Sequence, residues 1–239
     1  MKKSIHVALL VGFLGAGTWG LAGAPMALAA PVSDPNGLCN IHDSKGNCWV
    51  AASGPSVDIN MVFPANDPRE QAIVDYLSKV EKDFQGSTEL GTLDDPKPAQ
   101  ALDVTSTGYT SGTPATGTRT TVLKVYQNLG GAHPATWYKA FAYNNAAKAP
   151  ITFGTLFRSD AQPLGTILPL VEQQLSATVG QPITVSQDVG LDPANYQNFA
   201  ITNDAVIFFF DQNQIHPALE ATEVSVPRTA IADFLSPGI

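Results

Sequence analysis

A single histidine, His133, stands in the segment Gly-Gly-Ala-His-Pro, shortly before an aromatic run that starts at Trp137. An imidazole titrates near neutral pH, so a histidine in such a turn could serve as a general base or as a ligand contact. The glycines and Pro134 equally fit a tight corner between two strands, in which the ring nitrogens would hold loop carbonyls. Because the sequence identifies neither a nucleophile nor an orienting acid beside it, we favour the structural role and keep His133 as a candidate binding residue.

Acidic residues are the second group that could do chemistry, because a glycoside hydrolase needs only two carboxylates at a suitable separation in space. The candidates are Asp94, Asp95, Asp204, Asp211, Glu220 and Glu223. Since the chain contains 21 acidic residues, we expect most of these side chains to be solvated surface groups.

Other catalytic patterns are missing from the sequence. No serine lies in a Gly-x-Ser-x-Gly elbow, and no glycine-rich loop opens a helix in a way that would hold phosphate. His42, His133 and His216 are too far apart in the chain for a metal-binding helix. The residues therefore predict no catalytic residue, no metal site, no cofactor and no enzymatic activity.

The first 29 residues have the pattern of a signal peptide. Lys2 and Lys3 precede an apolar stretch over residues 5–21, and Ala-Leu-Ala at 27–29 offers the small residues that signal peptidase needs. Glycines interrupt the apolar stretch and no charged stop-transfer flank follows, which argues against a stable membrane span. We therefore expect a secreted, extracellular protein that begins near Ala30.

The expected mature chain is strongly acidic, with 11 basic and 21 acidic residues and a net charge of −10. Such a surface repels the phosphate backbone, so nucleic acid is not an expected partner. A protein partner from the host or the cell envelope is compatible with this charge, and the oligomeric state stays open.

Cys39 and Cys48 are the only cysteines and both lie in the exported part. An even number of cysteines in an oxidising compartment predicts a disulfide, worth about 2.5–3 kcal/mol for so short a loop. A metal site would need four ligands, and only His42 lies nearby.

Hydrophobic periodicity indicates mixed α and β structure. Alternation over residues 57–63 predicts a strand, and Asp67 with Pro68 and Glu70 predicts the start of a helix that ends at Gly86. Further strands are expected at 102–109, 120–128, 136–144, 151–153, 198–202, 205–210 and 222–227, and further helices at 164–179 and 228–235. The strands at 120–128 and 136–144 should form one hairpin. Asn203 and Asp204, which tolerate positive φ, should join the strands of a second.

Aromatic residues on the strand at 136–144 permit two interpretations. Trp137, Lys139, Phe141 and Tyr143 share one face, which could form a stacking platform for sugar rings but is more typical of a core. Trp137 and Tyr138 are kept as candidate binding residues. The Phe208–Phe210 run fits a central strand covered on both sides.

Several separated blocks, at 121–144, 150–157, 190–210 and 224–231, agree in order and spacing with a known group of proteins. They resemble the immunogenic protein 64 family of secreted mycobacterial antigens, within the RsiV-type family. That family includes the ectodomain of a lysozyme-sensing anti-sigma factor and an accessory domain of some peptidoglycan deacetylases. Its Gly-Gly-Ala-His and Phe-x-x-Thr-x-Asp patterns stand at residues 130–133 and 199–204, which adds Asp204 to the candidate binding residues.

The resemblance implies an α+β fold: a β-grasp-like mixed or antiparallel sheet with packed helices, preceded by a smaller N-terminal α/β part. We expect a signal peptide at 1–29, the N-terminal part with its disulfide at 30–110, and the RsiV-type domain at 111–239. The resemblance also implies a secreted, immunogenic, virulence-associated protein that binds a host or envelope protein without catalysis. A cell-wall glycan-binding module or a peptidoglycan-directed hydrolase is the alternative.

Overall fold

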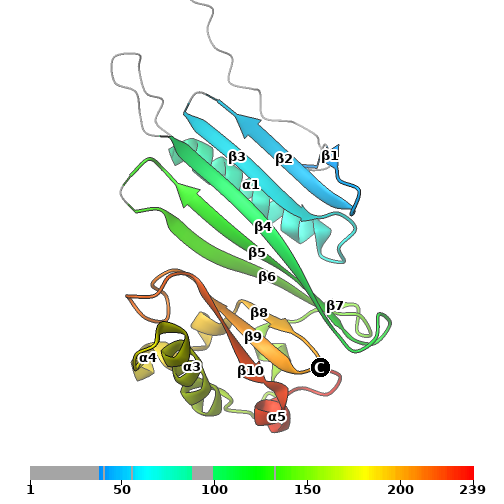
Figure 1. Ribbon diagram of the computed structural model, residues 1–239. Helices are drawn as coiled ribbons and strands as arrows, with labels where there is room; N and C mark the ends of the chain where they lie inside the picture. Colours follow the sequence, from blue (N-terminus) through cyan, green and yellow to red (C-terminus); the bar gives the residue numbers. More distant parts are fainter. Residues whose placement is uncertain (1–37, 40, 55, 88–98, 132) are drawn as a thin grey trace, which may run out of the picture.

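The computed structural model describes residues 38–39, 41–54, 56–87, 99–131 and 133–239. Within them the chain forms a seven-stranded sheet, in the order β1-β2-β3-β4-β5-β6-β7, and a three-stranded sheet, in the order β10-β9-β8. Figure 1 shows helix α1 (Glu70–Ser87) against the large sheet, and the small sheet with α3 (Leu164–Val179) beside its C-terminal strands. The mixed α+β class is confirmed. The expected signal peptide lies outside the described residues.

Five of the six pairs of neighbouring strands in the large sheet are antiparallel. Its strands are β1 (Ile41–His42), β2 (Asn47–Ser53), β3 (Val57–Pro64), β4 (Gln100–Ser111), β5 (Thr118–Asn128), β6 (Ala135–Asn144) and β7 (Ala149–Pro150). Neighbouring strands are antiparallel except β3 and β4, which are parallel. Because parallel neighbours need a crossover connection, α1 lies between these two strands in the sequence.

The predicted helix is present as α1, although its first residue is Glu70 and not Pro68, and Asp67 and Glu70 cap its start as expected. The Asp67 carboxylate accepts a hydrogen bond from the Arg69 backbone N–H at 2.7 Å, and the Glu70 carboxylate accepts one from the Asn66 N–H at 3.1 Å. These side chains satisfy backbone donors that have no partner within the helix. The helix then buries Ile73, Leu77 and Phe84 against the large sheet.

The hairpin between β5 and β6 is confirmed, with Val122 opposite Ala140 in its register. Of the two glycines in its turn, only Gly130 has a left-handed backbone conformation, with a φ of 79°. Gly131 does not have positive φ. The sequence alone allowed positive φ at both positions.

The C-terminal part contains the small sheet and most of the helices. Its elements are α2 (Phe153–Leu156), α3, α4 (Gln187–Gly190), η1 (Pro193–Tyr196), β8 (Phe199–Ile201), β9 (Ala205–Phe210), β10 (Thr222–Pro227), α5 (Arg228–Ile231) and η2 (Ala232–Phe234). The central position of β9 and its buried Phe208–Phe210 run are confirmed.

Two local expectations in this part are wrong. The segment 151–153 is not a strand, because the side chains of Thr152 and Thr155 form a capping box that starts α2 at Phe153. The hairpin between β8 and β9 does turn at Asn203 and Asp204, but neither residue has positive φ.

Three hydrophobic clusters arrange these elements in layers. One lies between α1 and the large sheet, and another lies between α3 and the small sheet. The third joins the two sheets and contains Val122, Tyr138, Ala200 and Phe209. The predicted domain boundary after residue 110 falls at the end of β4, inside the large sheet, and the division into two domains stays a prediction.

The predicted disulfide is present, with Cys39 and Cys48 joined by an S–S bond of 2.04 Å. Cys48 is fully buried in the cluster under α1, whereas Cys39 is only partly buried. The bond therefore ties the segment before β1 to the first long strand of the sheet.

The outer edge of β6 is covered by polar groups from the C-terminal part. The Asn198 side chain accepts a hydrogen bond from the Ala140 N–H at 3.1 Å and donates one to the Tyr138 carbonyl at 3.0 Å. Gln212 pairs with Thr136 through both its backbone and its side chain. An exposed strand edge invites pairing with another chain, and these groups occupy that edge.

Replacing Asn198 with alanine should lower the free energy of unfolding by about 1–3 kcal/mol, because it leaves a strand donor and acceptor without partners. Urea denaturation followed by tryptophan fluorescence measures this change. Gln197→Ala is the matched control: Gln197 is exposed and bonds only to Pro193 in its own turn, so a change within about 0.5 kcal/mol is expected. Equal stability losses for the two variants would contradict the role of Asn198.

Candidate functional site

Two of the predicted binding residues lie near opposite ends of strand β5. His133 follows the turn that joins β5 to β6, whereas Asp204 lies in the turn between β8 and β9. That second turn contacts the β4–β5 hairpin, because Asn203 Oδ1 accepts a hydrogen bond from the Gly112 N–H at 2.8 Å. The two ends are separated by the 11 residues of β5, roughly 35 Å of extended chain. These residues therefore do not form one site.

The side chain of His133 is exposed and forms no hydrogen bond with any described residue. Among the described residues, the ring therefore holds none of the loop carbonyls that a corner residue could hold, and the structural role stays a prediction. A role for His133 in binding stays a prediction.

Trp137 and Tyr138 lie on opposite faces of β6. Tyr138 packs against Phe209 of the small sheet, with ring centroids 5.1 Å apart. Trp137 shares its face with Lys139 and Phe141 and points toward α1, in agreement with the core interpretation of this face.

Four half-buried side chains lie near one another where α1, β6 and the residue after β9 approach: Tyr76, Trp137, Lys139 and Asp211. We call them the Asp211 cluster. Trp137 Nε1 donates a hydrogen bond to the Tyr76 hydroxyl oxygen at 2.7 Å. The ammonium of Lys139 lies over the Tyr76 ring, 5.9 Å from its centroid. Asp211 joins the group through the Tyr138 backbone N–H, which donates to its carboxylate at 2.7 Å.

Burial changes the acidity of two members of this cluster. It raises the pKa of Asp211, against the opposing effects of the Tyr138 N–H and the nearby Lys139 ammonium. Burial also raises the pKa of Tyr76, which the Trp137 hydrogen bond lowers and the Asp211 charge raises further. Perturbed acids that gather with a cation are typical of functional sites.

The cluster offers an acceptor for a proton and two hydrogen-bond donors. Because Trp137 donates to Tyr76, the hydroxyl proton of Tyr76 remains available, and Tyr76 donates to no described residue. Lys139 lies over the Tyr76 and Phe141 rings, and it forms no ion pair or hydrogen bond with another described residue. A carboxylate beside two such donors can take a proton from water while the donors stabilise a developing oxyanion.

Asp211→Asn should raise the melting temperature at neutral pH. The folded-state pKa of Asp211 lies above its ordinary value, so the ionised form is disfavoured by folding. The wild type pays no such free-energy penalty below the unfolded-state pKa of Asp211, and the penalty develops as pH rises to the folded-state pKa and above it. The asparagine variant has no charge to bury, and its amide oxygen can still accept the Tyr138 N–H. Thermal unfolding at several pH values between 3 and 8 measures it. A variant less stable than the wild type at pH 8 would contradict this expectation.

Sequence reasoning found only part of this cluster. Asp211 was one of six candidate acids, and Lys139 was noticed only as a neighbour of aromatic residues. Tyr76 was missed, although it precedes Leu77 on the buried side of the helix. Asp94 and Asp95 lie outside the described residues, and Glu220 and Glu223 are exposed.

Among the described residues, no group of three or more His, Cys, Asp or Glu side chains could hold a metal ion. A search of the same residues finds no helix that is both long and apolar enough to cross a membrane.

Comparison with known proteins places the chain in a family. Residues 154–229 match the model of a family described as a protein of unknown function, DUF3298. The chain belongs to the family of the mycobacterial immunogenic protein MPT64, and its C-terminal part carries the DUF3298 match. It is 41% identical over 196 residues to immunogenic protein MPT64 of Mycobacterium tuberculosis, with 81% of this chain and 85% of that protein covered. A DUF3298 member of Bacteroides fragilis has a similar fold, with a TM-score of 0.54 at 14% identity over 80% of this chain and 93% of its own.

A second mycobacterial relative corrects the prediction that this protein is not an enzyme. The chain is 42% identical over 232 residues to a Mycobacterium tuberculosis protein named esterase Rv3036c, covering 97% of this chain and 98% of that one. The prediction was wrong because it relied on local motifs. A site assembled from a helix, a strand and a loop leaves no contiguous signature in the sequence.

Proposed function

We propose that this protein is an ester hydrolase of the MPT64 family and that the Asp211 cluster is its active site. The observation that carries the activity is the 42% identity, over nearly the whole chain, to a relative named an esterase. The cluster is proposed because it combines an acid of raised pKa with two donors, Tyr76 and Lys139, that donate to no other described residue.

The proposed reaction is attack of water on the ester carbonyl. The water oxygen bonds to the carbonyl carbon while Asp211 accepts a proton from that water. The negative charge moves to the carbonyl oxygen. The Tyr76 hydroxyl and the Lys139 ammonium donate to that oxyanion. When the tetrahedral intermediate collapses, the bond to the alkoxy oxygen breaks and Asp211 returns the proton to the leaving alcohol.

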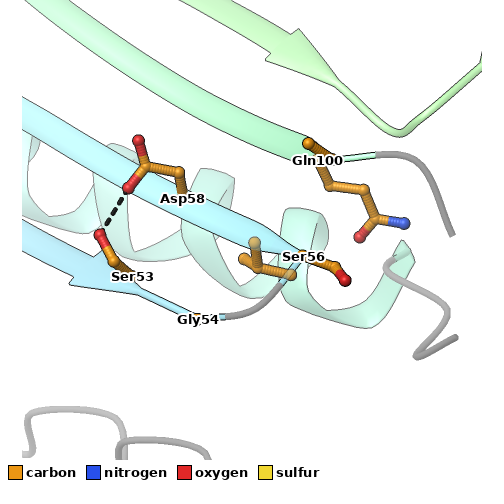
Figure 2. Close-up of a pocket in the computed structure, with 7 residues that line it drawn as sticks. Ser53, Gly54, Ser56, Asp58 and Gln100 are labelled. Atoms are coloured by element: carbon orange, nitrogen blue, oxygen red, sulfur yellow. Dashed lines mark hydrogen bonds between the residues drawn. The ribbon is translucent and has the colours of Figure 1, made fainter. Parts of the chain in front are cut away.

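The mechanism needs no serine nucleophile. One serine in the described part of the chain, Ser53, lies beside a carboxylate at a small cavity, and its hydroxyl donates to Asp58 at 2.6 Å (Figure 2). Both side chains are exposed and no histidine hydrogen-bonds to either, so this pair lacks the environment that activates a serine.

Hydrolysis of p-nitrophenyl acetate and butyrate by the chain from Ala30 to Ile239 tests this proposal. We expect turnover that a fluorophosphonate specific for activated serines leaves unchanged, and heat-denatured protein should be inactive. No turnover above that of the denatured protein would overturn the proposed activity. Inactivation together with labelling of one serine would overturn the proposed site.

Secretion and an antigenic role are part of the same proposal, supported by the signal-peptide pattern and by relatives named immunogenic proteins. The RsiV-type relationship, the β-grasp description, a part in virulence and a protein partner stay predictions. Pull-down with the disulfide-bonded mature protein is the corresponding experiment for the partner.

A further inference from the structure

One face of the large sheet carries aromatic and polar side chains on the side away from α1. Trp49 of β2 lies opposite Val62 of β3. Asn60, two residues before Val62, aligns with Asp103 of β4, which lies opposite Tyr126 of β5. Aligned residues share a face of a sheet, so these five side chains point the same way, and we call them the Trp49 face. Residues that alternate with them on each strand are buried under α1, which lies behind β2–β5 in Figure 1.

Trp49 is exposed and held in one orientation. It is 46% exposed, and its Nε1 donates a hydrogen bond to Asn60 Oδ1 at 2.7 Å. The other polar groups of the face are the Asn60 amide protons, the Asp103 carboxylate and the Tyr126 hydroxyl. They form no hydrogen bond or ion pair with any described residue. An oriented, exposed aromatic ring beside unpaired polar groups is typical of a surface that contacts a ligand.

The two aromatic rings lie at opposite ends of the Trp49 face. Three strand spacings and two residues along the strands separate Trp49 from Tyr126, which places their Cα atoms roughly 15 Å apart. Asn60 and Asp103 lie between them on β3 and β4. A ligand that reaches both rings is therefore elongated, and it meets hydrogen-bonding groups in its middle.

An extended peptide does not match the Trp49 face. The backbone groups of β3, β4 and β5 are used in pairing with neighbouring strands, because each of these strands lies inside the sheet. A peptide laid on the face would leave its own backbone N–H and C=O groups without backbone partners. Peptides that add to a sheet do so at an edge strand, where such partners remain.

The charges of the face disfavour an anionic ligand. Asp58, the next residue on this face of β3, adds a second carboxylate to that of Asp103. Lys124, the next residue on this face of β5, lies over the Tyr138 ring at the border with the small sheet. The groups between the two aromatic rings include both donors and acceptors, and a hydroxyl group can pair with either kind. A neutral ligand with many hydroxyl groups therefore complements the face.

We propose that the Trp49 face binds an extended, neutral glycan chain. A pyranose ring with equatorial hydroxyls has apolar C–H groups on its two faces and hydroxyls around its rim. Such rings can stack on Trp49 and Tyr126, while hydroxyls of the sugars between them donate to Asp103 and accept from the Asn60 amide. A β-1,4-linked chain is straight enough to reach both rings. The inference does not depend on the proposed esterase activity, because the face shares no residue with the Asp211 cluster.

The experiment titrates the mature protein with cellotetraose and chitotetraose and follows the indole N–H signals by NMR. The mature chain contains two tryptophans, Trp49 and Trp137, so the second signal is an internal control. We expect the Trp49 signal to shift saturably with a Kd of about 1 mM or below, while the Trp137 signal stays in place. No shift of the Trp49 signal at about 20 mM of either glycan would overturn the proposal.

Three comparison compounds test the chemistry of the ligand. Maltotetraose has the same hydroxyls on a curved chain, tetragalacturonate is anionic, and a lysine tetrapeptide with blocked ends is cationic. Each should bind at least tenfold more weakly than the better of the two β-1,4-linked glycans. Equal or tighter binding of the tetrapeptide or of tetragalacturonate would overturn the proposal. The preference between cellotetraose and chitotetraose shows whether the natural chain carries acetamido groups.

Two variants test the stacking rings, with binding measured by isothermal titration calorimetry. Trp49→Ala and Tyr126→Ala should each weaken binding of the preferred glycan at least tenfold, whereas Trp49→Phe keeps a ring and should stay within about threefold. Leu191→Ala is the matched control, because Leu191 is similarly exposed but follows α4 in the C-terminal part. A folded Trp49→Ala protein that binds the glycan like the wild type would overturn the inference.

Sedimentation velocity distinguishes a glycan site from a surface for self-association. We expect the wild type and Trp49→Ala to sediment as the same species, because the Trp49 face is open to a ligand in solution. A wild-type dimer that Trp49→Ala converts to a monomer would overturn the proposal, since a second copy of the chain would then cover the face.

Discussion

Asp211→Asn should lower kcat for p-nitrophenyl ester hydrolysis by about 10²–10⁴-fold, the usual contribution of a general base. Asparagine preserves the acceptor for the Tyr138 N–H but takes no proton from water, so the fold is retained while the chemistry is lost. Steady-state kinetics with circular dichroism on the same samples measure both. In the wild type, kcat/KM should fall as pH drops through the pKa of Asp211, which burial raises above its ordinary value.

Tyr76→Phe is the companion variant and should lower kcat by about 10²–10³-fold, the effect of removing one oxyanion donor. Asp160→Asn and Tyr143→Phe are the matched controls. Asp160 is exposed, and Tyr143 lies on the same strand but pairs with the short strand β7 away from the cluster. Loss of activity in a control to the same extent as in Asp211→Asn would show that the cluster has no special role.

Gly117→Ala should destabilise the protein by about 3 kcal/mol or more, the largest stability change that we expect from a single methyl group. A Cβ atom at this position would lie 1.7 Å from the Ser111 carbonyl oxygen and 2.8 Å from the Thr113 oxygen. Both are backbone atoms of the β4–β5 hairpin, so neither can move without opening the turn. The Gly117 carbonyl also accepts a hydrogen bond from the Asn145 N–H, which links this turn to the end of β6.

Gly108→Ala provides the control within the same hairpin. Gly108 lies in β4, and a Cβ there has no atom within 4 Å, so alanine should leave stability unchanged or raise it slightly. Chemical denaturation of both variants gives the comparison. A Gly117→Ala protein that unfolds at the wild-type denaturant concentration would show that the hairpin backbone is less constrained than its geometry requires.

Periodicity and capping residues predicted the local elements well, because their causes lie close together in the sequence. The capping of α1 by Asp67, the β5–β6 hairpin and the central β9 each follow from a few adjacent residues. The strand predicted at 151–153 is wrong because a short apolar run alone indicated it. The capping box that starts α2 there depends on Thr152 and Thr155 together.

The site was less predictable because its residues come from distant parts of the chain. Tyr76 and Trp137 are 61 residues apart, and Tyr138 and Asp211 are 73 residues apart. Nothing local distinguishes Asp211 from the other acids, since its raised pKa arises from burial at the edge of β6.

The central claim is that water attacks the ester directly at the Asp211 cluster, without an acyl-enzyme intermediate. Rapid-quench mass spectrometry of the mature protein mixed with excess p-nitrophenyl acetate tests it most directly. The account predicts linear release of p-nitrophenol from the first turnover and a protein mass that stays unmodified throughout. A burst of p-nitrophenol equal to the enzyme concentration, together with a protein that gains one acetyl group, would contradict it.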